Sequence, residues 1–358
     1  MPFSFLEDWL SKTQKGFNLL VSPRSFRPFS YFRSVQKVLK IAIVLLLVVA
    51  PLNLYCWGFF GHKSINRLAV FTLPTEIMAF YKQHLEYISE HAVDADMRRY
   101  ALKEEAPRHY IDIDHYGEQP FDDVPKQWFD AVDKYTEDTL QAYGIVPWHV
   151  ERMYKRLVDA FKKRDIPYIL KTSADLGHYI ADAHVPLHTT ENYNGQMTNQ
   201  HGIHGFWESR LPELYSEDYD FFVGRAKYVS DPLAAIWHAV EVSNNAVDSV
   251  LDFERQLNES FPSDRKYAFE ERGRSTIKAY SRDYSAEYHL MLDHMVERRM
   301  RASIITIGSF WFSAWVDAGK PDLSKPLSEE DERILEEERK QLEADYQARS
   351  VKSREHDE

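Results

Sequence analysis

The chain has 358 residues, 44% of them hydrophobic, and a formal net charge of −12 from 44 Lys and Arg against 56 Asp and Glu. This balance is that of a globular protein with a sizeable core, and it excludes low-complexity disorder for the bulk of the chain. A single Cys excludes an intrachain disulfide and a cysteine-rich zinc finger, and the acidic balance disfavours duplex binding through a generally basic surface.

The N-terminal segment has the pattern of an export signal. Basic and aromatic residues over 1–40 precede an apolar run from Ile41 to Ala50, which is shorter than the about 20 residues that a membrane-spanning helix needs. We therefore expect residues 1–56 to be a leader with a signal peptide that is cleaved before Trp57, so that the protein is periplasmic or extracellular. An uncleaved N-terminal membrane anchor is the alternative.

The middle of the chain has helical periodicity and few of the alternating patterns that indicate strands. Met153, Leu157 and Phe161, spaced four apart, form one apolar face of a predicted helix. Comparable periodicity recurs in Pro167–Ala183, Ala234–Leu251 and Ser285–Trp315. The sequence predicts a single all-α domain over residues 57–320. Residues 321–358 are dense in charge and are expected to form a tail, either a solvated helix or a frayed end.

The densest chemical signal is the run that contains His178, Asp182, Pro186 and His188. His178 and Asp182 are four residues apart on a predicted helix, so both side chains lie on one face. Pro186 is expected to end that helix and to turn the chain at His188.

Other short segments add His residues, most of them with carboxylates nearby: Trp57–His62, His91–Arg99, Arg108–Asp114 and His204–Glu208. Imidazole nitrogen and carboxylate oxygen are ligands of zinc, so together these segments predict a metal site. Buried His residues with ordinary hydrogen bonds beside helix ends are the alternative. The sequence has no H-E-x-x-H helix, Walker A loop, dinucleotide glycine fingerprint or G-x-S-x-G elbow.

The order of these motifs resembles the superfamily that joins bacterial zinc-dependent phospholipase C with the fungal and plant single-strand-specific zinc nucleases. There the mature chain begins with a Trp whose amino group and carbonyl bind zinc beside a nearby His, as Trp57 and His62 would here. An Asp then precedes a His-aromatic element. His109 matches this element, and Asp96 is favoured as the Asp, with Asp94 left open. The H-x3-D-x5-H and H-x3-E motifs follow in full, at His178, Asp182, His188, His204 and Glu208.

This resemblance implies a single multi-helix, all-α domain with a cleft that holds three zinc ions. The implied ligands are Asp96, His109, His178 and Asp182 for the first ion; the Trp57 main chain, His62 and Asp182 for the second; and His188, His204 and Glu208 for the third. The implied chemistry is attack of zinc-bound hydroxide on a phosphodiester. Asp182 would bridge two ions, and Asp96 would orient or deprotonate the water.

The substrate is left open between the two branches of the superfamily. Glu208 and the predicted helix Arg301–Gly319 favour phospholipase C-like hydrolysis of phospholipid head groups at a membrane surface, which is the first expectation. The spacing from Trp57 to His62, and Tyr110 at the position where the nucleases stack a base, favour a single-strand endonuclease that hydrolyses 3'-phosphodiester bonds. A zinc-binding envelope protein without turnover is the third hypothesis. No obligate protein partner is evident.

Overall fold

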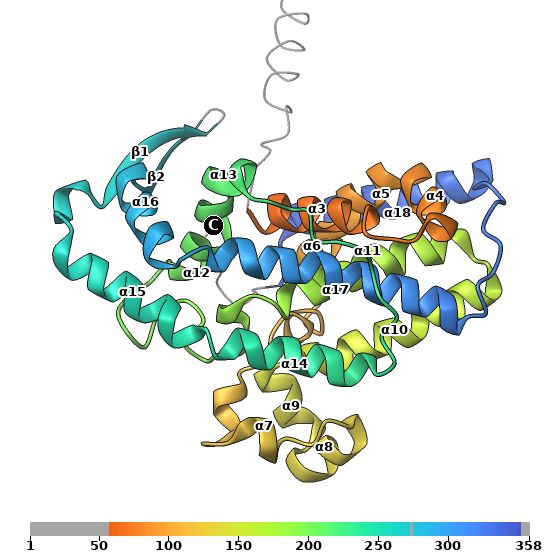
Figure 1. The fold of residues 1–358 in the computed structure, drawn as a ribbon, viewed down its shortest axis with the longest axis horizontal. Helices are drawn as coiled ribbons and strands as arrows, with labels where there is room; N and C mark the ends of the chain where they lie inside the picture. The colour runs from red at the N-terminus through yellow and green to blue at the C-terminus, as the bar shows by residue number, and fades with distance from the viewer. Residues whose placement is uncertain (1–56, 273–274, 352–358) are drawn as a thin grey trace, which may run out of the picture. The chain divides into compact units, whose positions relative to one another are not determined.

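The computed structural model describes residues 57–272 and 275–351, which belong to one compact unit, Leu54–Glu358. Helices make up most of this part of the chain, so the predicted all-α class is confirmed (Figure 1). Within the described residues, every helix is too short or too polar to cross a membrane. The predicted leader, residues 1–56, lies outside the described residues and stays a prediction.

The first half of the described chain contains α3 (Trp57–Val70), α4 (Thr75–Gln83), α5 (Leu85–Glu90), α6 (Asp94–Arg98), α7 (Pro120–Asp123), α8 (Trp128–Tyr135), α9 (Glu137–Tyr143), α10 (Val146–Lys163) and α11 (Ile166–Asp182). The second half contains α12 (Ile203–Gly205), a π-helical turn (Phe206–Arg210), α13 (Leu211–Tyr215), α14 (Pro232–Asn244), α15 (Val247–Ser260), the strands β1 (Tyr267–Arg272) and β2 (Ser275–Tyr280), α16 (Arg282–Met291), α17 (Met295–Asp317) and α18 (Glu329–Ala348). Single 3-10 turns include His91–Val93, Ala106–Arg108 and Pro186–Thr189.

The centre of the fold is a set of packed helices in which α11 contacts α3, α10 and α17. All α11 residues from Thr172 to Asp182 are buried. Asp165 starts the helix by accepting a hydrogen bond from the main-chain N of Tyr168 at 3.1 Å, and Pro167 occupies the first turn, where a missing N–H costs little. The helix ends at Asp182, so the predicted His and Asp motif lies at the buried end of a central helix.

The charged segment after Pro326 forms α18, and part of this helix is packed. Ser328 caps it: the Ser328 hydroxyl accepts a hydrogen bond from the main-chain N of Asp331 at 3.1 Å, and the Asp331 carboxylate accepts one from the main-chain N of Ser328 at 3.2 Å. Leu335 is buried, and α18 packs on α6 and α11. The sequence did not predict this packed face, because one buried Leu leaves little apolar periodicity.

α3 and α11 are in close contact at Gly177. A Cβ added there would lie 2.1 Å from Asn66 Oδ1, and Asn66 is held by a hydrogen bond from its Nδ2 to the Ala174 carbonyl at 3.1 Å. We expect Gly177→Ala to lower the free energy of unfolding by about 1–3 kcal/mol, because a buried neighbour must move. Urea unfolding followed by circular dichroism measures the change.

The Asn66→Ala background serves as the control for this substitution. There the added methyl group has room, so Gly177→Ala should cost less than in the wild-type chain. An equal cost in both backgrounds would show that Asn66 is not the obstacle.

Candidate metal centre

Segments that are far apart in the chain bring the predicted ligands together. α3 supplies His62, α6 supplies Asp96, His109 follows the turn Ala106–Arg108, α11 supplies His178 and Asp182, the turn Pro186–Thr189 supplies His188, and α12 and the π-helical turn supply His204 and Glu208. Three groups of donor atoms result, each with its donors within 4.8 Å of one another: His62, His178 and Asp182; Asp96, His109 and His178; and His188, His204 and Glu208. Every predicted side-chain ligand is in one of these groups.

The Asp182 carboxylate is the meeting point of four imidazole rings. Its Oδ2 lies 2.9 Å from His109 Nδ1 and 3.2 Å from His178 Nε2, and its Oδ1 lies 3.3 Å from His62 Nε2 and 3.7 Å from His188 Nδ1. Burial would raise the pKa of Asp182, but the charges of His178 and His188 hold it well below its ordinary value. Asp182 therefore stays ionised and is shared between the groups.

Asp96 completes a second group from the opposite side. Its Oδ1 lies 3.7 Å from both His109 Nδ1 and His178 Nε2. His178 Nδ1 is bonded to the Ala92 carbonyl at 2.8 Å, which leaves Nε2 to face the carboxylates. Burial would lower the pKa of His178, but Asp182 and Asp96 raise it to about 9. The carboxylates of Asp96 and Asp182 therefore stabilise a positive charge at the His178 ring.

The third group has the same construction. His188 Nε2 and His204 Nε2 lie 3.3 Å and 3.1 Å from Glu208 Oε2. Their Nδ1 atoms are bonded to main-chain carbonyls, that of His188 to His109 at 2.6 Å and that of His204 to Tyr193 at 3.1 Å. A carbonyl acceptor fixes the tautomer, so both rings present Nε2 to the same space. Burial would raise the pKa of Glu208, but His204 and His188 hold it well below its ordinary value.

The hairpin β1–β2, which the sequence did not predict, supports the turn that carries Glu208. Arg210 Nη1 donates to Glu270 Oε2 on β1 at 2.8 Å. The ring of Phe206 stacks on that of Tyr280 on β2, with centroids 3.8 Å apart. These contacts hold both ends of the π-helical turn, so the hairpin helps to set the position of Glu208.

The remaining predicted residues lie as follows. Asp94, the alternative ligand, is outside the donor groups: its Oδ2 is bonded to His91 Nδ1 at 2.8 Å and its Oδ1 pairs with Arg339. Tyr110 is half-buried directly after His109, with the main chain of Val146 donating to its carbonyl at 3.1 Å. Trp57 is the first residue of α3, whose second turn carries His62.

Glu105 is a buried carboxylate beside the centre that the sequence analysis missed. Its Oε1 lies 3.7 Å from His109 Nε2, on the side of the ring away from the donor group, and it accepts a hydrogen bond from the Tyr179 hydroxyl. Burial would raise the pKa of Glu105, but His109 and Arg98 hold it well below its ordinary value. A carboxylate in this place favours the ring orientation in which Nε2 faces Glu105 and Nδ1 faces the donor group. Its position four residues before His109 was the available signal.

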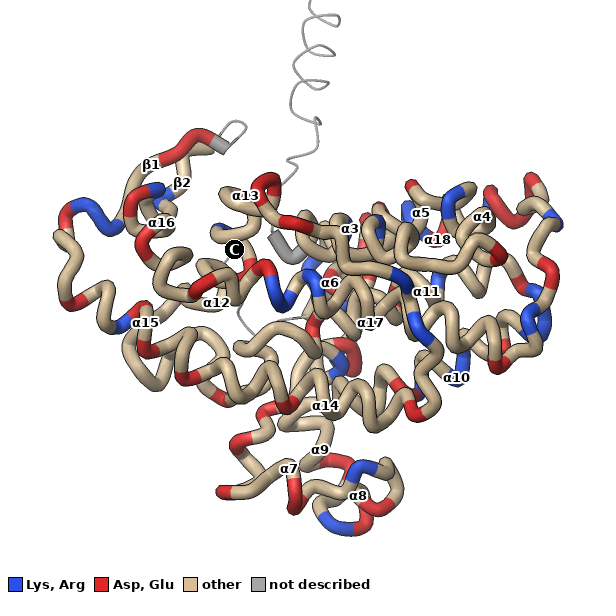
Figure 2. Tube along the Cα trace, in the orientation of Figure 1, with Lys and Arg blue, Asp and Glu red and all other residues tan. Residues whose placement is uncertain are grey.

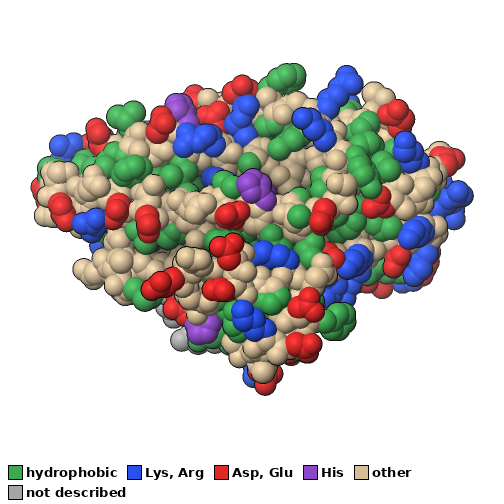
Figure 3. Space-filling model, turned by 60° about the horizontal axis from the view of Figure 1, so that its bottom comes forward, with side chains coloured by type: hydrophobic (Ala, Val, Ile, Leu, Met, Phe, Trp, Pro, Cys, Tyr) green, Lys and Arg blue, Asp and Glu red, His purple; other side chains and the backbone are tan. Residues whose placement is uncertain are grey.

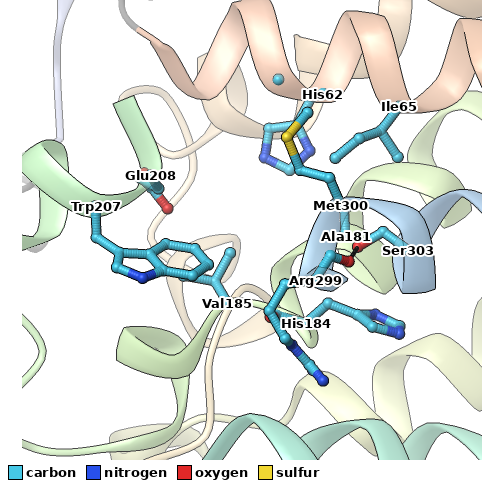
Figure 4. A pocket seen from close by; sticks show the side chains of 11 residues that line it. His62, Ile65, Ala181, His184, Val185, Trp207, Glu208, Arg299, Met300 and Ser303 are labelled. Atoms are coloured by element: carbon cyan, nitrogen blue, oxygen red, sulfur yellow. Dashed lines mark hydrogen bonds between the residues drawn. The ribbon is translucent and has the colours of Figure 1, made fainter. Parts of the chain in front are cut away.

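A small pocket borders the donor groups (Figure 4). His62 and Glu208 face it from α3 and the π-helical turn, and Trp207 and Met300 form part of its apolar wall. Donors of two groups therefore line one pocket.

The donor set fits zinc, which takes imidazole nitrogen and carboxylate oxygen. In two places ring nitrogens face each other at short distance: His178 Nε2 lies 3.0 Å from His109 Nδ1, and His188 Nε2 lies 3.1 Å from His204 Nε2. Lone pairs that face each other repel unless a proton or a cation lies between them. Because the other ring nitrogens face carbonyls or a carboxylate, the facing nitrogens are the atoms through which each place could hold a metal ion.

Replacing His188 tests the third group. We expect the purified His188→Ala chain to bind about one zinc ion fewer than the wild-type chain, because one of three donors is lost. Emission spectrometry after dialysis measures the zinc content per chain. His238→Ala is the matched control, since this side chain is 75% exposed and outside the groups. Undiminished zinc in His188→Ala would mean that this group holds no ion.

Comparison with known proteins places the chain in a family. Residues 57–303 match the family described as S1/P1 Nuclease, a span that covers more than half of the chain and includes every predicted side-chain ligand. No curated protein matches the chain. The family match confirms the resemblance found in the sequence, since these proteins are all-α, zinc-dependent phosphodiesterases. The chain belongs to the S1/P1 nuclease family and is a zinc-dependent phosphoric ester hydrolase.

Proposed function

We propose that the protein hydrolyses phosphodiester bonds in single-stranded nucleic acid, with one zinc ion in each of the three donor groups. The observation that carries the proposal is the convergence of these groups around Asp182 in a chain that belongs to a nuclease family. Zinc bound there supplies Lewis acidity to water and to phosphate oxygens. Two residues of the chain complete the chemistry.

Asp96 is suited to accept the proton of the attacking water. Its side chain is 16% exposed, against 2% for Asp182, so it is the more accessible of the two carboxylates. Burial would raise the pKa of Asp96, but His178 and His62 hold it below its ordinary value. The carboxylate is therefore ionised at neutral pH and can take a proton from water aimed at phosphorus.

Arg99 is placed to bind the phosphate. Its Nη1 lies 3.5 Å from Asp96 Oδ1. Burial lowers the pKa of His204, and the charges of His188 and, last, Arg99 add to this effect. A planar guanidinium binds phosphate oxygens through paired hydrogen bonds. We assign Arg99 to the non-bridging oxygens of the scissile phosphate.

The charge distribution favours a flexible strand over a duplex. Acidic and basic residues are interspersed along the described chain, and on the face in Figure 3 they form no continuous basic surface (Figures 2 and 3). His109 and His178 are buried, so the phosphate must enter a recess. A single strand can bend into a recess, and a base beside it can stack on Tyr110, a contact that tolerates any base.

Glu208 favours a second candidate, hydrolysis of phospholipid head groups. Its carboxylate completes the third group, 3.1 Å from His204, and Glu at this position is the form that the resemblance assigns to the phospholipase C branch. The family match is to the nucleases, so this candidate ranks second.

A side-by-side assay decides between the two substrates. The zinc-loaded chain beginning at Trp57 is incubated with single-stranded DNA, duplex DNA and phosphatidylcholine vesicles. We expect rapid cleavage of the single strand, slower cleavage of the duplex, intact lipid, and loss of all cleavage with a chelator. Phosphocholine release with intact DNA would instead establish the second candidate. Turnover of neither substrate would reject both.

The amino terminus of the mature chain provides a second test. We propose that the protein is exported and cleaved before Trp57. Cleavage frees the amino group of Trp57, which can join His62 and Asp182 as a zinc donor, whereas the amide nitrogen of an uncleaved chain cannot. A chain with two extra residues before Trp57 should therefore bind about one zinc ion fewer than the chain that begins there and lose most of its activity. Equal zinc content and equal turnover in the two chains would refute this coupling of processing to activation.

A further inference from the structure

α18 lies outside residues 57–303, which match the family, yet it packs on the helix that carries Asp96. That helix, α6, has five residues, and a helix so short depends on its neighbours for its orientation. α18 contacts Asp94, the first residue of α6, and Tyr100, which follows the end of α6. The two contacts therefore lie on either side of Asp96 in the chain.

The first contact is an ion pair between Arg339 and Asp94. Arg339 Nη1 pairs with Asp94 Oδ1, while Arg339 Nε donates to Glu343 Oε1 at 2.8 Å, one turn further along α18. The second oxygen, Asp94 Oδ2, is bonded to His91 Nδ1 at 2.8 Å. Both oxygens of Asp94 are thus engaged away from the donor groups, and Asp96 is the carboxylate of α6 that faces them.

The second contact surrounds Tyr100. The ring of Tyr346 meets it edge to face, with centroids 5.4 Å apart, and the guanidinium of Arg349 lies 5.0 Å from its centroid. The main-chain N of Val351 donates to the Tyr100 carbonyl at 2.9 Å. Tyr346 also lies 6.3 Å, between centroids, from Phe59 in the first turn of α3. One end of α18 therefore touches both α3 and the segment after α6.

We propose that α18 is a positioning element of the metal centre and that Arg339 is its principal residue. Acting through Asp94, Arg339 holds Asp96 toward His109 and His178 and keeps Asp94 from competing as a ligand. Without this ion pair the segment can turn, and a donor group that depends on exact placement binds its ion more weakly. The inference rests on the proposed zinc site and is independent of the substrate.

Zinc binding by variants of α18 tests the inference in the chain from Trp57 to Glu358. Arg339→Ala is compared with Lys340→Ala, the matched control, whose side chain is 67% exposed and pairs with Glu336 within α18. Competition with a chromophoric chelator measures zinc affinity. We expect Arg339→Ala to weaken one zinc ion about 10-fold or more and Arg339→Lys to recover part of the loss. Lys340→Ala should bind as the wild type does. Equal zinc affinities in Arg339→Ala and Lys340→Ala overturn the proposal.

A double variant separates positioning from stability. If Arg339 acts through Asp94, adding Asp94→Asn to Arg339→Ala should weaken zinc binding no further, whereas additive losses contradict the proposal. The melting temperature of metal-free Arg339→Ala is measured in parallel. If this variant unfolds, Asp94→Asn alone, which preserves side-chain size, supplies the test: it should weaken the same ion, and unchanged affinity overturns the inference. The two proposals can fail separately. If Arg339→Ala weakens zinc binding while the wild-type chain cleaves no nucleic acid, the positioning role is supported and the proposed function is rejected.

Discussion

The structure depends on one constraint, the burial of the ionised Asp182 carboxylate among four imidazole rings. A buried charge is tolerated only where it is paired and hydrogen-bonded, so the segments that supply the rings must stay together. Two of them, α3 and α11, approach closely because Gly177 has no side chain. His62 can therefore reach the end of α11. The same helix contacts therefore build the core and bring the donor side chains together.

Local geometry accounts for one part of the predicted site. His178 and Asp182 are one helical turn apart, so periodicity alone puts them on one face. The choice between Asp94 and Asp96 is not local, because the partner that occupies Asp94 is Arg339, 245 residues away. Glu105 has one local signal, its position four residues before His109, but the Tyr179 hydroxyl and Arg98 that surround it in the fold are not marked by that spacing. Long-range pairing of charges leaves no periodic trace in a sequence.

The helical class of the fold was predictable, and the positions of its breaks were not. Helical periodicity runs over Ser285–Trp315, and the chain forms two helices there, α16 and α17, separated where His294 adopts a left-handed conformation with φ of 59°. The pattern of apolar residues continues across such a break, since it reports the buried face and not the main-chain angles. The hairpin escaped notice because β1, with the sequence YAFEER, lacks alternating apolar residues. The hairpin contacts the π-helical turn through Glu270 and Tyr280, and these contacts join residues that are distant in the sequence.

The hydrogen bond from His188 to the main-chain carbonyl of His109 joins two donor groups through the backbone. An ion that fixes the ring of His109 also steadies the carbonyl against which His188 is set. The positions of the His109 and His188 rings are therefore coupled, and the free energy of this coupling is shared by both groups. If zinc occupies both groups, binding in one should therefore favour binding in the other.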